Sequence, residues 1–327
     1  MTKRRTYSDD EIRAALEASR GNVAATARAL GANERSLRRR IKAMKGDLEA
    51  PDGFRVTGKS TLIDRRTGET VLEWVKISRD AERQRELIAE AIEAMCEDVP
   101  RIKPTPGPRQ TLDHLLAVYP MGDPHIGMLS WGEETGADFD LGIAERDLCA
   151  AMAYLVEQAP PAKRALIANL GDFFHADNMA GVTSRSGHVL DMDSRLPKMV
   201  RVGVRVMRQL IASALEKHET VEVVNAIGNH DDVLSMALSI MLANIYENEP
   251  RIVIHDQPTP RHYIRHGKVL IGITHGHTTK DADLPLIMAT ERHKDWGETT
   301  ARYWYRGHHH HDAKKEYNGC IVEQFRT

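Results

Sequence analysis

The stretch "ALIANLGDFFHADN", residues 165–178, begins as an apolar run and ends abruptly in polar side chains. The run reads as a buried strand, and Asp172 and His175 fall where it stops. Four other stretches have the same form: "LLAVYPMGDPHIG" (115–127), "VEVVNAIGNHDD" (221–232), "KVLIGITHGH" (268–277) and "RYWYRGHHHH" (302–311). The pattern predicts strands that carry polar clusters at their ends.

Helical stretches separate these strands. The clearest are "GIAERDLCAAMAYLVEQ" (142–158), "KMVRVGVRVMRQLIASALEKH" (198–218) and "VLSMALSIMLANIYEN" (233–248). Strands that alternate with helices predict an α/β layered fold, in which ligands gather at strand ends. We therefore expect the polar clusters to converge in space.

The polar clusters contain residues of the kinds that bind metals, namely Asp123, His125, Asp172, Asn229, His275, His308 and His310. Mixed carboxylate, imidazole and amide ligands suit Mn, Fe or Zn better than Ca or Mg. Seven ligands exceed what one catalytic ion takes, so two ions that share a carboxylate are expected. A lone histidine is usually a core or surface residue, but five ordered clusters at strand ends are hard to explain in that way.

The stretches "GDPH", "GDFFH", "GNHD", "THGH" and "GHHH" resemble the five ordered motifs of the calcineurin-like metallophosphoesterases. The resemblance covers residues 113–327 and implies a layered β-sandwich flanked by helices. It implies hydrolysis of phosphate esters by a water held between two divalent ions, most often Mn(II), with Fe or Zn as alternatives. In this family one ion would be held by Asp123, His125, Asp172 and His310, and the other by Asp172, Asn229, His275 and His308.

Three further residues are candidates for catalysis. His230 directly follows a ligand, so it is free to donate a proton or a hydrogen bond to the leaving oxygen. Asp231 would orient His230 or, equally well, cap its own loop. His175 stands where phosphatases of this superfamily carry an aspartate. The "GDFFH" form resembles instead the nuclease branch, the SbcD-like DNA-repair exonuclease subunits, in which this histidine helps to position the substrate phosphate.

Two features of the resemblance bear on the substrate. The arrangement of the whole chain resembles phage-encoded members of the superfamily, which favours a nuclease. The family's sheet normally continues beyond the last motif, so we expect residues 113–327 either to be a C-terminally truncated domain or to depend on a partner that covers an edge of the sheet. There is no room after residue 310 for the capping domain and ATPase-docking segment of the repair exonucleases.

The run of four histidines at 308–311 has two readings. Consecutive histidines can be the remnant of a purification tag, but this run lies between "RYWY" and "CIVEQF" rather than at a terminus. In an extended segment His308 and His310 would project to the same side and His309 to the other. The sequence therefore predicts two ligands, with His309 and His311 beside them.

The first 46 residues form a basic module, with twelve Lys or Arg against five Asp or Glu. Three short helices are expected, with a Gly31 turn before "ERSLRRRIK", and the module resembles the helix-turn-helix of the Fis type. Leu37 and Ile41 would face inward. The outward residues Arg35, Arg38, Arg39 and Lys42 would then bind DNA phosphates largely without regard to sequence. The alternative is a solvated basic helix in an ordinary bundle, and a homodimer through this module is possible.

Residues 47–112 are expected to connect the two domains by a β-hairpin around "RRTGE", a helix and a proline-rich linker. "GFRVTGKS", residues 53–60, matches the phosphate-binding P-loop pattern. That loop needs an apolar strand before it and a helix after it. "DLEAPD" precedes the match and a strand-like "TLID" follows, so no nucleotide-binding P-loop is expected.

The composition is that of a globular protein, with 28% charged and 41% hydrophobic residues over 327 positions. No apolar run reaches membrane-spanning length and no hydrophobic signal core is present, so a cytoplasmic location is expected. The leading hypothesis is a two-metal DNA phosphodiesterase delivered to DNA by its N-terminal module. One alternative is a phosphomonoesterase or cyclic-nucleotide phosphodiesterase whose N-terminal module binds protein. Another is a DNA-binding regulator with an idle metal domain.

Overall fold

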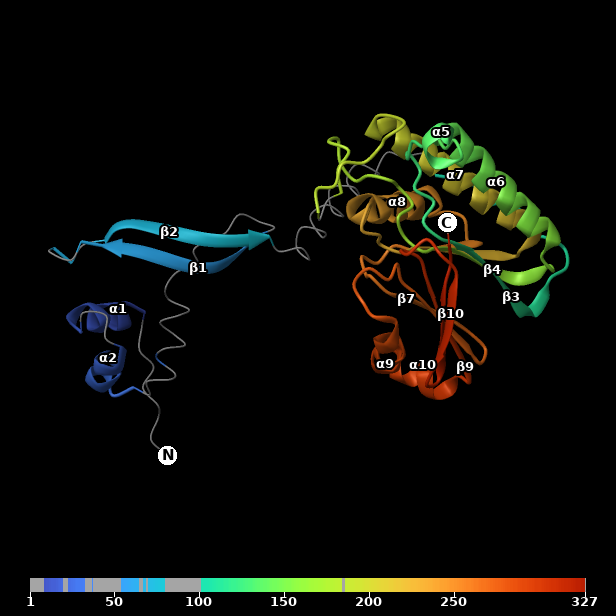
Figure 1. Ribbon diagram of the computed structural model, residues 1–327. Coiled ribbons are helices and arrows are strands. Elements are labelled where there is room, and N and C mark those ends of the chain that lie inside the picture. Colours follow the sequence, from blue (N-terminus) through green and yellow to red (C-terminus); the bar gives the residue numbers. More distant parts are fainter. Residues whose placement is uncertain are drawn as a thin grey trace. The chain divides into compact units, whose positions relative to one another are not determined.

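The structure is a computed structural model that describes residues 9–19, 23–32, 37, 54–64, 67–68, 70–79, 101–183 and 186–326. Two compact units make up the chain, Met1–Gln84 and Arg85–Thr327 (Figure 1). Among the described residues, no helix is both long enough and apolar enough to cross a membrane.

The described residues of the first unit include two helices and a hairpin. These are α1 (Asp9–Ala18), α2 (Val23–Leu30), β1 (Phe54–Ile63) and β2 (Thr70–Arg79), the two strands being antiparallel. Ile12, Ala27 and Leu37 are almost fully buried and form a small core for the helices. Leu37 therefore faces inward, as the periodicity predicts. The expected DNA-binding residues Arg35, Arg38, Arg39 and Lys42 lie outside the described residues, as does the helix expected near 80–98.

The hairpin contains the P-loop-like match. Residues 54–60 of that match lie in β1 and continue without a break into "TLI", the last three residues of the same strand. Lys59 pairs with Val75 and Ser60 with Trp74 of β2. The glycine, lysine and serine of the pattern are thus part of a β-ladder.

The second unit contains two β-sheets. The first sheet has four parallel strands in the order β3 (Leu112–Met121), β4 (Ala162–Asn169), β5 (Thr220–Asn225) and β6 (Ile252–His255). The second is mixed, in the order β10 (Ala313–Tyr317), β11 (Cys320–Gln324), β9 (Ala301–Arg306), β8 (Val269–Ile273) and β7 (His262–His266). The strands β10 and β11 extend this sheet past the fifth motif.

Helices cover the outer faces of both sheets, as Figure 1 shows. On the side of the first sheet lie α5 (Gly132–Thr135), α6 (Leu141–Gln158), α7 (Leu196–Lys217) and α8 (Asp232–Ile245). On the side of the second lie the 3-10 turn η1 (Asp281–Asp283), α9 (Leu284–Glu291) and α10 (His293–Glu298). The expected α/β sandwich flanked by helices is therefore confirmed.

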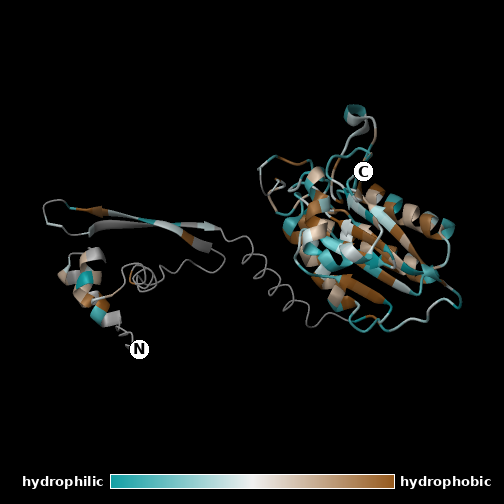
Figure 2. Cartoon of the chain, turned by 90° about the horizontal axis from the view of Figure 1, so that it is seen from below, coloured by the Kyte–Doolittle hydropathy of each residue, from teal (hydrophilic) through white to brown (hydrophobic). Residues whose placement is uncertain are grey.

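Three apolar cores hold these layers together. The largest joins the first sheet to its helices, as where Ile167 of β4 packs with Val206 of α7. A second lies between the sheets, where Leu166 of β4 meets Ile271 of β8. The third packs Trp304 of β9 against α9. Figure 2 shows hydrophobic residues along the strands and hydrophilic ones on the surrounding loops. Burial on both faces explains why the strands read as continuous apolar runs.

The proline-rich segment before β3 has no helix or strand at residues 101–110, and it is bonded to other parts of the second unit. Thr105 donates from its backbone N–H and its hydroxyl to Glu249, at 2.7 and 2.8 Å. Arg251 donates to the carbonyl of Pro106 at 3.0 Å. The backbone N–H of Ile102 donates to Ile245 at the end of α8. These bonds fasten residues 102–106 beside the first sheet.

Candidate metal centre

The candidate ligands lie on loops that follow the carboxyl ends of five strands. Asp123 and His125 follow β3, Asp172 follows β4 and Asn229 follows β5. His275 follows β8 of the other sheet, and His308 and His310 follow β9. Because β3, β4 and β5 are parallel neighbours, their ends share one edge of the sheet. The structure brings all seven predicted ligands together at that edge.

The ligands form two groups, each of which could hold a metal ion. Asp123, His125 and His310 make one, and Asp172, His275 and His308 make the other. In the first group the Nε2 atoms of His125 and His310 are 3.2 Å apart. In the second, Nε2 of His275 is 3.1 Å from Oδ2 of Asp172. A further group of His125, His175 and His230 adjoins the first.

The environment of His275 fits a metal ligand. Its Nδ1–H donates to the carbonyl of Leu170 at 2.9 Å, which leaves the Nε2 lone pair directed at the site. That lone pair faces Oδ1 of Asn229 at 2.9 Å as well as Oδ2 of Asp172. Three acceptor atoms this close repel one another unless a proton or a cation lies between them. The donor set therefore suits a divalent ion at this point.

The charges of the site also fit a cation. Burial lowers the pKa of His125 to about 3 and that of His308 to about 4, so both rings are neutral and can offer a lone pair. Burial raises the pKa of Asp123, whose carboxylate lies near that of Asp172. Burial also acts to raise the pKa of Asp172, but His275 holds it below its usual range when Nε2 carries a proton, in the place a metal ion would take, and donates to this carboxylate. A metal ion would stabilise the ionised form of both buried carboxyl groups.

Backbone strain is concentrated at the same residues. Among the described residues, those other than glycine with a positive φ are Asp123, His125, Asp172, His308 and His310, with values from 43° to 80°. A positive φ is unfavourable for side chains with a Cβ and persists where the surrounding structure enforces it. All five are predicted ligands, so the strain marks the same site that the motifs mark.

A glycine beside a ligand permits the close packing of the loops. A Cβ at Gly228 would lie 2.1 Å from Oδ1 of Asp172 and 2.5 Å from Oδ1 of Asp231. No side chain fits at that distance, so Asn229 can approach the other ligands only because its predecessor has none.

The three candidates for catalysis also lie at the centre. Nδ1–H of His230 donates to the carbonyl of His175 at 2.9 Å, which leaves Nε2 as the second ring nitrogen. The rings of His175 and His230 stack at 5.4 Å, and burial lowers the pKa of His175 to about 4. The carboxylate of Asp231 accepts the backbone N–H groups of Gly228 and Phe174. Of the two roles expected for Asp231, these bonds fit the capping of loops.

The histidine run is bent, whereas an extended segment was expected. His308 and His310 have φ values of 80° and 53°, and no residue from 307 to 312 belongs to a strand. The backbone N–H of His308 donates to both oxygens of Asp123, at 3.0 and 2.9 Å. This bend sends His308 to one ligand group and His310 to the other. His309 and His311 are exposed, and the carbonyl of His309 contacts Nδ1 of His311.

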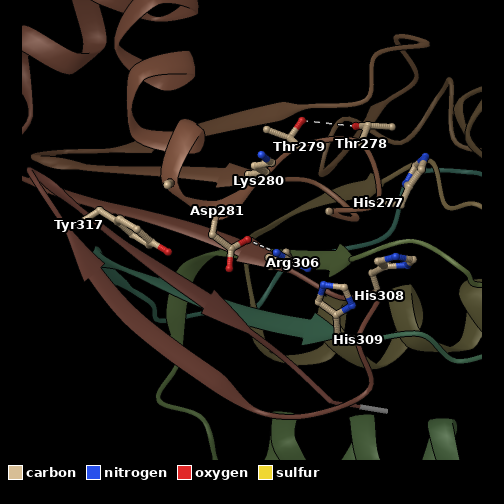
Figure 3. A pocket seen from close by; sticks show the side chains of 11 residues that line it. His277, Thr278, Thr279, Lys280, Asp281, Arg306, His308, His309 and Tyr317 are labelled. Carbon is tan, nitrogen blue, oxygen red and sulfur yellow. Dashed lines mark hydrogen bonds and ion pairs between the residues drawn. The ribbon is translucent and has the colours of Figure 1, made fainter.

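Two features of the site were not predicted from the sequence. Asp177 accepts the backbone N–H groups of Val233 and Leu234 at 2.8 Å and so caps α8, although it lies 56 positions before Val233. Burial raises the pKa of Asp177 to about 6. The second feature is Arg306, which is 3% exposed and lines a pocket of about 580 Å³ beside His308 (Figure 3). Its position directly before the glycine and histidines was the only signal for it.

Comparison with known proteins identifies the N-terminal module. Residues 8–44 match the family described as "Bacterial regulatory protein, Fis family", so the module is a Fis-type helix-turn-helix. No curated protein matches the chain.

Solved structures share partial similarity with the second unit. One is a conserved uncharacterized protein, a predicted phosphoesterase, from Streptococcus pneumoniae, at 11% identity, TM-score 0.23, and coverage of 64% of this chain and 70% of that one. Another is a single mutant of Vps29 from Entamoeba histolytica, at 11% identity, TM-score 0.27, and coverage of 64% and 72%. The α/β architecture itself is established by the strand order and the layers of helices.

Proposed function

We propose that this protein is a metal-dependent phosphodiesterase that hydrolyses DNA and is directed to it by the N-terminal helix-turn-helix. The observation that carries the proposal is the convergence of seven predicted ligands in two adjacent groups. The seven ligands lie on five loops that are strained or closely packed. Strain of this kind is retained where it serves a site.

Two divalent ions would occupy these groups, with Asp172 between them. Asp123, His125 and His310 would hold one ion, and Asn229, His275 and His308 the other. Mixed imidazole and carboxylate ligands suit Mn, Fe or Zn, and the resemblance to the metallophosphoesterases favours Mn(II) among them. When bound, such ions act as Lewis acids towards phosphate oxygens and lower the pKa of water.

The chain's own residues would position the substrate and move protons. With Nδ1 of His230 fixed by the carbonyl of His175, its Nε2 is available to protonate the leaving oxygen. His175 stacks on that ring and would help hold the phosphate. Asp231 would act indirectly, by fixing the loops of Gly228 and Phe174 around the ligands.

DNA is the preferred substrate for two reasons. The Fis-type module brings a basic face, and the "GDFFH" motif resembles the nuclease branch of the metallophosphoesterases. A phosphomonoesterase or cyclic-nucleotide phosphodiesterase would use the same metal ions on a small substrate. A regulator with an idle centre would hydrolyse no phosphate ester. These alternatives predict different outcomes in one assay.

The test is incubation of the purified protein and Mn(II) with linear, circular, single-stranded and double-stranded DNA. Asp172→Ala is the control, because it removes the carboxylate shared by the two groups. Cleavage by the wild type alone is expected. Hydrolysis of a chromogenic monoester without cleavage of any DNA would refute the nuclease assignment, and inactivity on every ester would favour the regulator.

A further inference from the structure

The pocket beside His308 has the chemistry of an anion site. It is lined by the turn after His275 and by the end of β9, including Thr278, Thr279, Lys280, Asp281 and Arg306 (Figure 3). Its volume of about 580 Å³ lies in the range of small-molecule sites and could admit a nucleotide. His308, a candidate metal ligand, forms part of its wall.

Arg306 is the distinctive residue of this pocket. Its Nη1 bonds to Asp281, and within the described residues neither Nε nor Nη2 has a hydrogen-bond partner, although the side chain is 3% exposed. Leaving buried donors unpaired is costly, and more so for a charged group. Nε and Nη2 are the two nitrogens that a guanidinium presents as a fork to a phosphate or carboxylate.

The backbone around Arg306 makes room for this arrangement. A Cβ at Gly276 would lie 2.7 Å from Nε and 3.1 Å from Nη2, so a larger residue there would displace the guanidinium. Gly276 lines the pocket together with Arg306. The face of the guanidinium therefore packs on Gly276, at the wall of the pocket.

The charge of the pocket favours an anion. The charged side chains that line it are Lys280 and Arg306 against Asp281, which leaves one formal positive charge. The exposed side chain of Lys280 and the hydroxyls of Thr278 and Thr279 add donors along the wall. By contrast, the chain outside its first 46 residues carries a net formal charge of −9.

We infer that this pocket binds the phosphate next to the scissile one in a DNA strand, through Arg306 and Lys280. The inference rests on the proposed function, since it places the scissile phosphate at the metal centre. The pocket shares His308 with that centre, so a strand that crosses the metals would enter it directly. Recognition of a second phosphate would distinguish a polynucleotide from a monoester.

The test measures binding of short thymidine ligands to the full chain in EDTA, by titration calorimetry. The ligands are the dinucleotide TpT, its 5′-phosphate pTpT, its 3′-phosphate TpTp, and the mononucleotide pT. All are too short to span a helix-turn-helix site. We expect pTpT or TpTp to bind about 10-fold more tightly than TpT, because one of them places a phosphate on the guanidinium.

Four variants test whether Arg306 and Lys280 cause the tighter binding of the dinucleotide with a terminal phosphate. Arg306→Gln should abolish it, and Arg306→Lys should reduce it, because a lysine keeps the charge near Asp281 but loses the fork. Lys280→Gln should reduce it about threefold, since this side chain is exposed. Lys294→Gln, an exposed lysine on α10 away from the pocket, is the matched control and should change nothing. Circular dichroism checks folding, and if Arg306→Gln does not fold, Lys280→Gln decides.

The outcomes separate the two proposals. Equal affinity for all dinucleotides, or a preference that survives the Arg306 and Lys280 variants, would overturn the inference. So would pT binding as tightly as pTpT and TpTp, because the pocket would then take a terminal phosphate of a small molecule. A preference that depends on Arg306, in a protein that hydrolyses no diester with Mn(II), would support this pocket and refute the proposed function. Diester hydrolysis with Mn(II), without tighter binding of pTpT or TpTp, would support the proposed function and refute this pocket.

Discussion

The N-terminal module and the rest of the chain carry net charges of opposite sign. Residues 1–46 have a formal charge of +7, and the rest of the chain has −9. The basic charge lies in a Fis-type module, whereas the acidic part contains the candidate metal centre. A basic surface attracts a polyanion over its whole length, but cations at a buried site act on one phosphate. We therefore expect DNA affinity and phosphate chemistry to be separable by mutation, and the following changes test that separation.

The largest effect is expected from Asp172→Asn. This change removes a negative charge from the carboxylate between the two ligand groups, so turnover of a chromogenic diester should fall about 1,000-fold. Bound Mn(II), measured by mass spectrometry after gel filtration, should fall too. Affinity for DNA in EDTA should stay within about twofold, since the basic module supplies it. A parallel loss of DNA affinity would mean that the two functions are coupled.

The histidine run offers an internal comparison. His308→Ala and His310→Ala should each lower diester turnover about 100-fold, because each removes a ligand from a different group. His309→Ala and His311→Ala, at exposed positions of the same bend, should change turnover less than about threefold. Steady-state kinetics with Mn(II) measures all four. Equal effects would show that the run does not act through two specific ligands.

Asp177 should make the stability of the second unit depend on pH. Burial raises its pKa from 3.8 to about 6, so the folded unit holds this proton more tightly than the unfolded chain does. The resulting stabilisation is complete below pH 4 and is lost as the pH rises through 6, up to about 3 kcal/mol. Urea unfolding from pH 4 to 7 should show this slope, and Asp177→Asn should flatten it. An unchanged slope in the variant would assign the dependence to other groups.

The smallest effect is expected in the basic module. Replacing Arg35, Arg38, Arg39 and Lys42 together by Gln should weaken DNA binding about 10-fold at low salt. The dependence of log affinity on log salt should flatten by about one unit, because a 10-fold loss near 0.1 M salt should vanish near 1 M if these residues contact phosphates. Diester turnover should not change. Fluorescence anisotropy over a salt series measures the first two quantities, and unchanged affinity would contradict the DNA-binding role of these residues.

Much of the candidate centre could be read from the sequence because its signals are local. Asp172 ends an apolar run, and a parallel strand buried on both faces needs such a run. The α/β layered fold follows from the alternation of these strands with helices, whereas the two-sheet sandwich was implied by the family resemblance. Leu37 could likewise be placed inside its module from periodicity alone, and its burial agrees.

Other features depend on residues that meet only in the folded chain. The family resemblance assigned His308 and His310 to different ions, but the bend held by Asp123, which carries them to two ligand groups, appears only in the fold. The cap of α8 comes from Asp177, which no pattern of neighbouring residues could connect to that helix.

The sequence by itself determined the kinds of ligand, the strands that carry them and the basic character of the N-terminal module. These are properties of adjacent residues, since hydrophobic periodicity and side-chain chemistry act within a few positions. Only the tertiary structure decided the bend at His308 and His310 and the contact of Arg306 with Asp281 in a pocket beside His308. Asp123 and His308 are far apart in the sequence, and they meet because the two sheets that carry them pack against each other. The apolar core between the sheets fixes that packing.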